Sequence, residues 1–355
     1  MFTSVARARP GSIFYSIDCF KATRYLALSA VVAGLCVACQ EPPAATSQPL
    51  IVGNSPWPGF VAQFIAEEKG FYDDEGIVVK EKHFQVSTDV DAALLANKMD
   101  LAWTGVPDML VMANEIPSLR LIAVSDYSDG ADGILATGVD KPQDLVGKTI
   151  AWEDLPLQAL LLQAYLAKTE EDGNEETDIK IKDLDLRVMP AAESATAFAA
   201  GRVDVAVTFE PYLSDAVKEG RGEVVFSSED TNLIAGGLIG KDSTLNDRRE
   251  DIEAYLRALD RGLDFYENNR AEALEIVANK LELPVEELGP IMENVRLLSP
   301  AEHSAVIFNT DNPLNIIDSI SFAAEVGTDL RLVKPSVEAS TLYDASYTRG
   351  AATTH

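Results

Sequence analysis

From residue 50 onward, short runs rich in β-branched residues alternate with longer stretches of helical periodicity, and this alternation restricts the possible folds. Strands separated by helical crossovers are typical of α/β proteins with parallel sheets. The expected strands are 49–53, 77–84, 100–104, 119–124, 133–137, 148–152, 184–189, 203–209, 223–226 and 232–239. The expected helices are 58–69, 88–97, 107–114, 156–168, 192–200 and 211–220, and 248–322 is expected to be helical throughout.

The chain is expected to change lobe after Gly130 and to return through the strand 232–239. We therefore predict an α/β fold with two doubly wound sheets joined by a two-segment hinge. In open α/β sheets, ligands bind at the carboxyl ends of strands, so the two lobes would close on a ligand. The expected bounds are 50–132 with 235–340 for lobe 1, 133–234 for lobe 2, and 341–355 for a polar C-terminal tail.

The N-terminal segment 1–39 predicts export. Lys21 and Arg24 precede the apolar run 25–38, which is shorter than the roughly 20 residues of a membrane-spanning helix. Cys39 follows small residues and precedes a polar, proline-rich linker at 40–49, an arrangement that resembles a bacterial lipoprotein processing site with Cys39 as the lipidated residue. An ordinary cleaved signal and a buried apolar segment stay open as alternatives, as does a start codon downstream of Met1.

Composition excludes several kinds of site. All three cysteines, Cys19, Cys36 and Cys39, lie in the leader, so the remaining chain has no disulfide and no thiolate metal site. The three histidines have no zinc spacing and no nucleophile motif beside them, and we expect no metal and no cofactor. The formal charge is −28, and removal of the basic leader makes it about −31, which disfavours nucleic acid as a partner.

An ordered set of motifs resembles the periplasmic solute-binding proteins of ABC importers, in the nitrate/sulfonate/taurine branch that includes thiamine-pyrimidine binders. The motifs are GNSPWPG at 53–59, AEEKGFYDDEGI at 66–77, ALLANKMDLA at 93–102, DLVGKTI at 144–150, AAGRVDVAV at 199–207 and FEPY at 209–212. The resemblance covers roughly residues 50–280. It implies a type II bilobal periplasmic-binding-protein fold, a periplasmic location, and an ABC permease and ATPase as partners. It also implies a monomer that binds a solute and is not an enzyme.

Candidate ligand contacts are polar or aromatic residues at or just beyond the ends of expected strands, or at the lobe crossing. They are Ser55, Trp57, Gln85, Thr104, Asp108, Asp126, Tyr127, Asp132, Glu153, Asp154 and Glu210. Each has a plainer interpretation as a solvated loop, cap or turn residue, and Thr104 is a candidate helix N-cap.

The candidate set contains six carboxylates and neither lysine nor arginine. Binders of nitrate or sulfonates favour helix N-termini and basic side chains at the anion, whereas buried carboxylates need a cationic partner. We therefore predict a small cationic or N–H-rich solute, such as an amine or a guanidine, with Trp57 or Tyr127 available for a cation–π contact.

The alternatives left open are a sulfonate, taurine, nitrate or thiamine-pyrimidine ligand, an enzyme of pyrimidine synthesis on the same scaffold, and a sensory lipoprotein. For the enzyme, His83 is the histidine closest to the expected strand ends.

Overall fold

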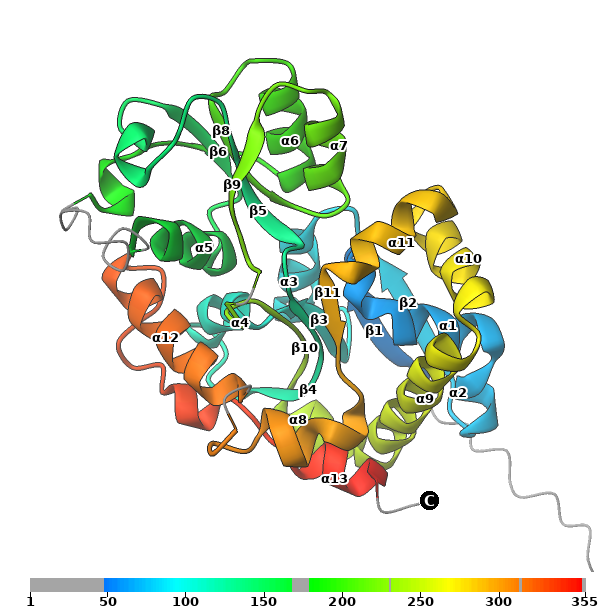
Figure 1. Cartoon of the computed structure of the whole chain (residues 1–355). Helices are drawn as coiled ribbons and strands as arrows, with labels where there is room; N and C mark the ends of the chain where they lie inside the picture. Colours follow the sequence, from blue (N-terminus) through cyan, green and yellow to red (C-terminus); the bar gives the residue numbers. More distant parts are fainter. Residues whose placement is uncertain (1–47, 168–178, 230, 313–314, 353–355) are drawn as a thin grey trace, which may run out of the picture. The chain divides into compact units, whose positions relative to one another are not determined.

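The computed structural model describes residues 48–167, 179–229, 231–312 and 315–352 (Figure 1). The predicted leader 1–39, with Cys39, and the linker 40–49 except its last two residues lie outside these ranges. The chain from Ser47 to His355 forms one compact unit. None of the helices in the described ranges combines the length and the apolar character of a membrane-spanning segment.

The first sheet of the described chain has the spatial order β11-β4-β10-β3-β1-β2. β1 runs parallel to β2 and β3, whereas β10 runs antiparallel to both of its neighbours, β3 and β4. The strands are β1 (Leu50–Asn54), β2 (Val79–His83), β3 (Leu101–Gly105), β4 (Leu119–Ser128), β10 (Ala235–Lys241) and β11 (Val295–Leu297). The helical segments between them are η1 (Pro58–Phe60), α1 (Val61–Lys69), α2 (Phe71–Asp74), α3 (Ser87–Leu95) and α4 (Val106–Ala113).

The second sheet of the described chain has the order β7-β6-β8-β5-β9. Its strands are β5 (Asp132–Ala136), β6 (Thr149–Trp152), β7 (Asp185–Val188), β8 (Val205–Phe209) and β9 (Glu223–Ser227). Its helical segments are η2 (Pro142–Leu145), α5 (Pro156–Ala167), η3 (Ile181–Asp183), α6 (Ala191–Ala199) and α7 (Tyr212–Lys218). α5 packs between this sheet and α4, and α6 packs against β8 and α7.

The two sheets share one strand order. Each contains three parallel strands, β2-β1-β3 or β7-β6-β8, followed by an antiparallel strand, β10 or β5. The prediction of parallel sheets was therefore correct for the three-stranded parts and wrong for β5 and β10. β10 enters the first sheet from the second and begins at the edge where β1 and β3 end. β5 enters the second sheet from the first and begins at the edge where β6 and β8 end. Each therefore runs antiparallel to the strands beside which it begins.

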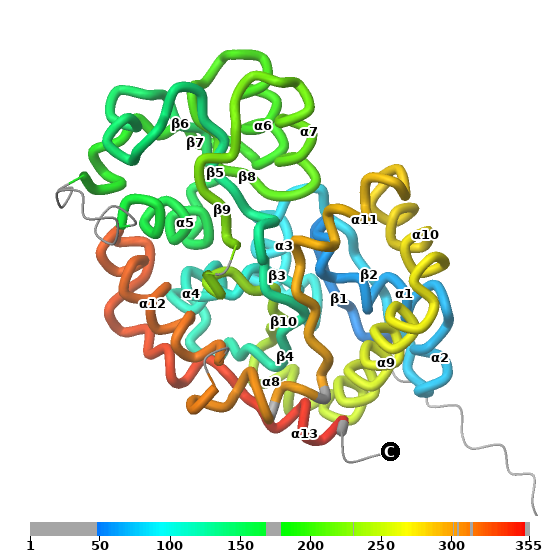
Figure 2. The backbone as a smooth tube through the Cα atoms, in the orientation of Figure 1, coloured from blue at the N-terminus to red at the C-terminus, as the bar shows by residue number. Residues whose placement is uncertain are grey.

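Two neighbouring crossings connect the sheets, one from β4 to β5 and one from β9 to β10 (Figure 2). The hydroxyl oxygens of Ser128 and Ser228 lie 2.6 Å apart in a hydrogen bond, and both side chains are buried. The Ser228 hydroxyl also accepts the backbone N–H of Gly130 at 3.0 Å and of Asp132 at 3.2 Å. These bonds satisfy backbone groups that the crossing removes from both sheets, and they hold the two crossings side by side.

The C-terminal third returns to the first sheet. Its helices are α8 (Asp242–Asp247), α9 (Arg249–Asn268), α10 (Arg270–Leu281), α11 (Val285–Glu293), α12 (Ile316–Asp329) and α13 (Ser346–Ala352), and α12 packs against both α4 and α5. The prediction of helix throughout 248–322 was wrong at β11, which pairs with the edge of β4. A three-residue strand is too short for alternation to reveal, and its pairing depends on an edge that only the tertiary structure supplies.

A histidine completes the edge of β4 beyond the reach of β11. His303 Nε2 accepts the backbone N–H of Val124 at 2.7 Å, and Nδ1 lies 2.7 Å from the carbonyl oxygen of Ser299. The side chain is fully buried, and burial lowers the pKa of His303 to about 4. The neutral imidazole therefore serves as the hydrogen-bond acceptor that a neighbouring strand would otherwise provide.

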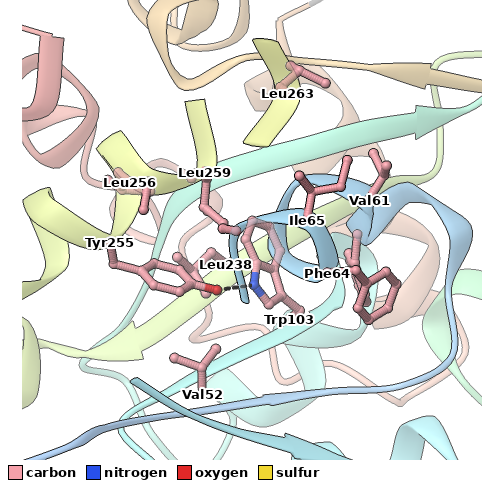
Figure 3. Packing of buried hydrophobic residues seen from close by; sticks show 14 of the residues in the cluster. Val52, Val61, Phe64, Ile65, Trp103, Leu238, Tyr255, Leu256, Leu259 and Leu263 are labelled. Atoms are coloured by element: carbon pink, nitrogen blue, oxygen red, sulfur yellow. Dashed lines mark hydrogen bonds between the residues drawn. The ribbon is translucent and has the colours of Figure 1, made fainter. Parts of the chain in front are cut away.

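The core of the first sheet is closed by α1 and α9, which pack closely against each other (Figure 3). Trp103 of β3 donates its indole N–H to the hydroxyl of Tyr255 of α9 at 3.0 Å, so a buried polar pair links strand and helix. A Cβ atom on Gly262 of α9 would lie 2.3 Å from the carbonyl oxygen of Ala62. Glycine at this position therefore lets the two helix backbones approach each other.

Candidate ligand-binding site

A cavity of about 60 Å³ lies where the strand ends of the two sheets face each other. An apolar cavity of about 150 Å³ holds a benzene molecule, so this cavity suits a smaller solute. Its lining is Ser55, Trp57, Phe60, Ser87, Trp103, Thr104, Gly105, Asp108, Asp132, Glu153, Leu155, Leu157, Gln158, Phe209, Ile234, Ala235 and Gly236. The lining contains acidic and aromatic side chains but neither lysine nor arginine.

Trp57 forms one wall of the cavity in a fixed orientation. Its indole N–H donates to Asp126 Oδ1 at 3.0 Å, and its ring meets the ring of Phe209 edge-on at a centroid distance of 6.0 Å. A Cβ atom on Gly59 would lie 2.3 Å from the indole nitrogen and 2.2 Å from Asp126 Oδ2. Glycine in the GNSPWPG motif thus leaves the space in which the indole and the carboxylate meet. Asp126 lies behind Trp57 and does not line the cavity.

Three carboxylates line the cavity, those of Asp108, Asp132 and Glu153. Asp108 Oδ1 accepts the N–H of Leu157 at 3.0 Å, in the first turn of α5. Glu153 lies near Ala191, the first residue of α6, whose backbone N–H partly offsets the rise that burial causes in the pKa of Glu153. Asp132 is held through its backbone, whose N–H donates to the hydroxyl oxygen of Ser128 at 3.0 Å. The carboxylate of Asp108 therefore occupies the amino-terminal end of α5, and Glu153 lies beside that of α6, two positions that would otherwise attract an anion.

Burial raises the pKa values of these acids. The pKa of Asp132 rises to about 7, first through loss of hydration and then through the nearby negative charges of Asp126, Glu153 and Glu210. Burial also raises the pKa of Asp108 well above its usual range, and the neighbouring Asp91 adds to the effect. Asp91 lies behind the cavity, accepts a hydrogen bond from Thr104 at 2.9 Å, and has its pKa raised by burial to about 7.

No lysine or arginine of the described residues forms an ion pair with Asp91, Asp108, Asp132 or Glu153. Several acids thus share a dry region without a counter-charge, and their ionised forms repel one another. The arrangement favours the binding of a solute that carries a positive charge or N–H donors.

A second cavity of about 200 Å³ adjoins the first and shares Ser87, Glu153 and Phe209 with it. Its other lining residues are Pro56, Gln85, Val86, Pro190, Ala191, Ala192, Glu193 and Tyr212. Gln85, an expected ligand contact, lies here and not in the inner cavity.

The structure brings six of the expected contacts together around the inner cavity: Ser55, Trp57, Thr104, Asp108, Asp132 and Glu153. Thr104 lies within β3 and its hydroxyl bonds Asp91, whereas the N-cap of α4 is Gly105, so the N-cap interpretation of Thr104 was wrong.

Besides Asp126, three more of the expected contacts line neither cavity. Tyr127 is fully buried beneath the guanidinium of Arg296, at 4.8 Å from the ring centroid. Asp154 is exposed in the left-handed region, with φ of 60°. The carboxylate of Glu210 accepts the backbone N–H and the hydroxyl of Ser214, so it caps α7.

The sequence patterns did not predict that Gln158 and the aromatic residues Phe60, Trp103 and Phe209 would line the cavity. The aromatic side chains have the spacing of core residues, and no periodicity distinguishes a cavity wall from a core. Gln158 carried a usable signal, because it is a polar residue in the otherwise apolar first turns of 156–162. Such a residue in a buried helix needs a hydrogen-bond partner.

No cluster of three histidine, cysteine or acidic side chains in the described ranges is arranged to hold a metal ion. His83, the histidine considered for an enzyme, is largely exposed on β2 and its ring contacts Asn54 and Phe64, away from the cavity lining.

The family model described as NMT1/THI5 like matches residues 57–273. A putative aliphatic sulfonates-binding protein of Bacillus subtilis (strain 168) is 24% identical over 245 residues, which cover 66% of this chain and 71% of that protein.

Two solved structures have the same fold. The alkanesulfonate-binding protein SsuA from Xanthomonas axonopodis pv. citri, bound to MOPS, aligns with a TM-score of 0.69 at 17% identity, covering 83% of this chain and 98% of SsuA. A Candida albicans protein described as having the generic periplasmic binding protein fold aligns with a TM-score of 0.60 at 12% identity, covering 84% of this chain and 96% of that chain. The predicted bilobal α/β fold is therefore confirmed.

Proposed function

The chain belongs to the NMT1/THI5-like family, and we propose that it is an extracytoplasmic solute-binding protein of an ABC importer that captures a small cationic or N–H-rich solute. The solute would lie in the inner cavity, between strand ends of the two sheets. Amines and guanidine-type compounds are the proposed class, in place of the sulfonates bound by its relatives.

The observation that carries this proposal is the charge of the cavity. Asp108, Asp132 and Glu153 line it, and no basic side chain does. A sulfonate or nitrate would need N–H donors at the anion, yet Asp108 already accepts an N–H at the start of α5, and Glu153 lies beside the start of α6. An anion would therefore displace these carboxylates or lie against them, whereas a cation would neutralise them.

The apolar walls favour the same class of solute. Trp57, Phe60, Trp103 and Phe209 surround the carboxylates, and the indole of Trp57 is anchored by its bond to Asp126. A cation beside an aromatic face gains about 0.5–2 kcal/mol, more when water is excluded. The volume of about 60 Å³ favours a solute of a few heavy atoms.

Isothermal titration calorimetry tests the proposal with methylammonium, guanidinium, taurine and nitrate. We expect the cations to bind and the anions to give no heat of binding. Asp108→Asn should weaken cation binding at least tenfold, because one carboxylate of the cavity is lost. Asp264→Asn, which removes an exposed carboxylate of α9, is the matched control and should bind as the wild type does. Tight binding of taurine or nitrate with the cations silent would contradict the proposal.

The proposal includes the cellular setting. We propose that the protein is a monomer, anchored to the membrane through a lipid on Cys39, and that it delivers its solute to a permease and an ATPase without catalysing a reaction. Uptake of a labelled amine by cells that carry the chain and its permease would support transport, and binding without uptake would favour a sensory role. Mass spectrometry of the mature N-terminus tests the lipid on Cys39.

A further inference from the structure

Two residues that line the inner cavity each carry a buried polar atom with no hydrogen-bond partner among the described residues: Gln158 Nε2 and Asp132 Oδ2. Gln158 is 2% exposed and Asp132 is 3% exposed, so bulk water does not solvate either side chain in this arrangement. Buried polar groups in folded proteins almost always have a partner, and two in the same cavity point to a ligand that satisfies both.

The orientation of the Gln158 amide is fixed by its neighbour. Gln158 Oε1 accepts the backbone N–H of Glu153 at 2.7 Å. Turning the amide over would direct its NH₂ group at this N–H donor, so the oxygen must face Glu153 and the nitrogen is the free group. The lining residues therefore carry one unpaired N–H donor, at Gln158, together with the unpaired oxygen of Asp132.

These two atoms call for a solute that carries a hydrogen-bond donor at one end and an acceptor at the other. Asp132, with Asp108 and Glu153 near it, calls for a positive charge or N–H groups, whereas Gln158 calls for an acceptor such as a carbonyl oxygen. We propose that the solute is a compact amine that also carries a carbonyl-type hydrogen-bond acceptor, with the amine held at Asp132 and the acceptor at Gln158. This inference rests on the proposed function and narrows its class of solute.

A simple cation or anion would pair with only one of the two kinds of polar group in the cavity. A guanidinium ion or an alkylamine supplies donors and leaves Gln158 Nε2 unpaired. A small anion supplies acceptors and leaves the carboxylates without a partner. A site with a buried hydrogen-bonding group discriminates strongly against an analogue that lacks the matching group, because that group stays unpaired in the complex.

Two probes of the same shape test the inference: glycinamide and isobutylamine. Each has five heavy atoms and a primary amine, and the carboxamide of glycinamide replaces the two methyl groups of isobutylamine. Calorimetric titration of the wild type at pH 8 should give a Kd for glycinamide at least tenfold lower than for isobutylamine.

Variants separate the two ends of the cavity. Gln158→Glu keeps the acceptor that bonds Glu153 and replaces the free donor by an oxygen, so the preference for glycinamide should disappear. Gln158→Met, which has neither group and a similar volume, should lose the preference as well and serves if the glutamate variant does not fold. Asp132→Asn should weaken both amines by a similar factor and leave the preference in place.

The outcomes distinguish this inference from the proposed function. Equal affinities for the two amines in the wild type, or a preference that persists in both Gln158 variants, would overturn the inference and leave a cation-binding protein. If neither amine bound and taurine did, the inference and the proposed function would both fail.

Discussion

Replacing Asp132 by asparagine should stabilise the ligand-free protein at pH 8, although the residue lines the cavity. Burial raises the pKa of the Asp132 carboxyl from 3.8 to about 7, so the folded protein binds a proton there more tightly than the unfolded chain does. Each pKa unit corresponds to about 1.4 kcal/mol, which gives a destabilisation of about 4 kcal/mol when the group is ionised. Asparagine keeps the shape and cannot ionise, so we expect a gain of about 2–4 kcal/mol at pH 8.

The gain should depend on pH with a defined sign. The raised pKa of Asp132 destabilises the fold fully above about pH 7, where the carboxyl is ionised in both states. Below about pH 4 the carboxyl is protonated in both states, and the effect is absent. The advantage of Asp132→Asn over the wild type should therefore shrink steadily between pH 7 and pH 4.

Differential scanning calorimetry is the suitable assay, because urea and guanidinium are themselves N–H-rich solutes of the proposed class. For about 300 residues the entropy of unfolding is about 0.6 kcal/mol per degree, so 2–4 kcal/mol corresponds to an increase in Tm of about 3–6 °C. The control Asp264→Asn should shift Tm by less than about 1 °C at both pH values. A lower Tm for Asp132→Asn at pH 8, or an equal gain at pH 4 and pH 8, would refute the reasoning.

Two further predictions concern the frame around the site. Gly262→Ala should destabilise the protein by about 2–4 kcal/mol, because its Cβ would lie 2.3 Å from the backbone oxygen of Ala62. The control Gly289→Ala in α11 meets no atom within 4 Å and should be neutral or stabilising by up to about 1 kcal/mol. Thermal unfolding of both variants checks this prediction. His303→Gln should reduce the loss of stability on acidification. Because its pKa is lowered to about 4, His303 contributes stability above pH 6.5 that is lost as the pH falls through 4. Glutamine still offers a hydrogen-bond acceptor to the N–H of Val124 and does not bind a proton. If Tm of the variant and of the wild type fell in parallel from pH 7 to pH 4.5, the role assigned to His303 would be wrong.

The sequence predicted the fold well because the strands and helices of the two sheets carry strong local patterns. Gly70 after α1 and the turns after α3 and α6 mark the ends of helices, and an α/β fold needs such turns between each helix and the next strand. The direction of β5 and β10 was not predictable, because it depends on the sheet from which each strand arrives. β11 was missed for a related reason, since its pairing is long-range and its length is three residues.

Part of the candidate site also followed from the sequence. Residues at strand ends such as Trp57, Asp108 and Glu153 reached the cavity because parallel strands of one sheet end on the same side. Glu210 also follows a strand end, yet its carboxylate turns back to cap α7. A sequence does not reveal which way a side chain turns at such a position, and for the same reason it does not reveal that the free group of Gln158 is its nitrogen.

The hydroxyl pair of Ser128 and Ser228 has a mechanical consequence. Two chain segments fastened at adjacent points define an axis, so we expect one sheet to swing relative to the other about that line and to resist twisting across it. α12 contacts both α4, which follows a strand of the first sheet, and α5, which follows a strand of the second, so we expect it to limit that swing. The adjoining cavity lined by Gln85 and Tyr212 is the route that we expect a solute to take, and its departure rate would depend on how far that swing goes.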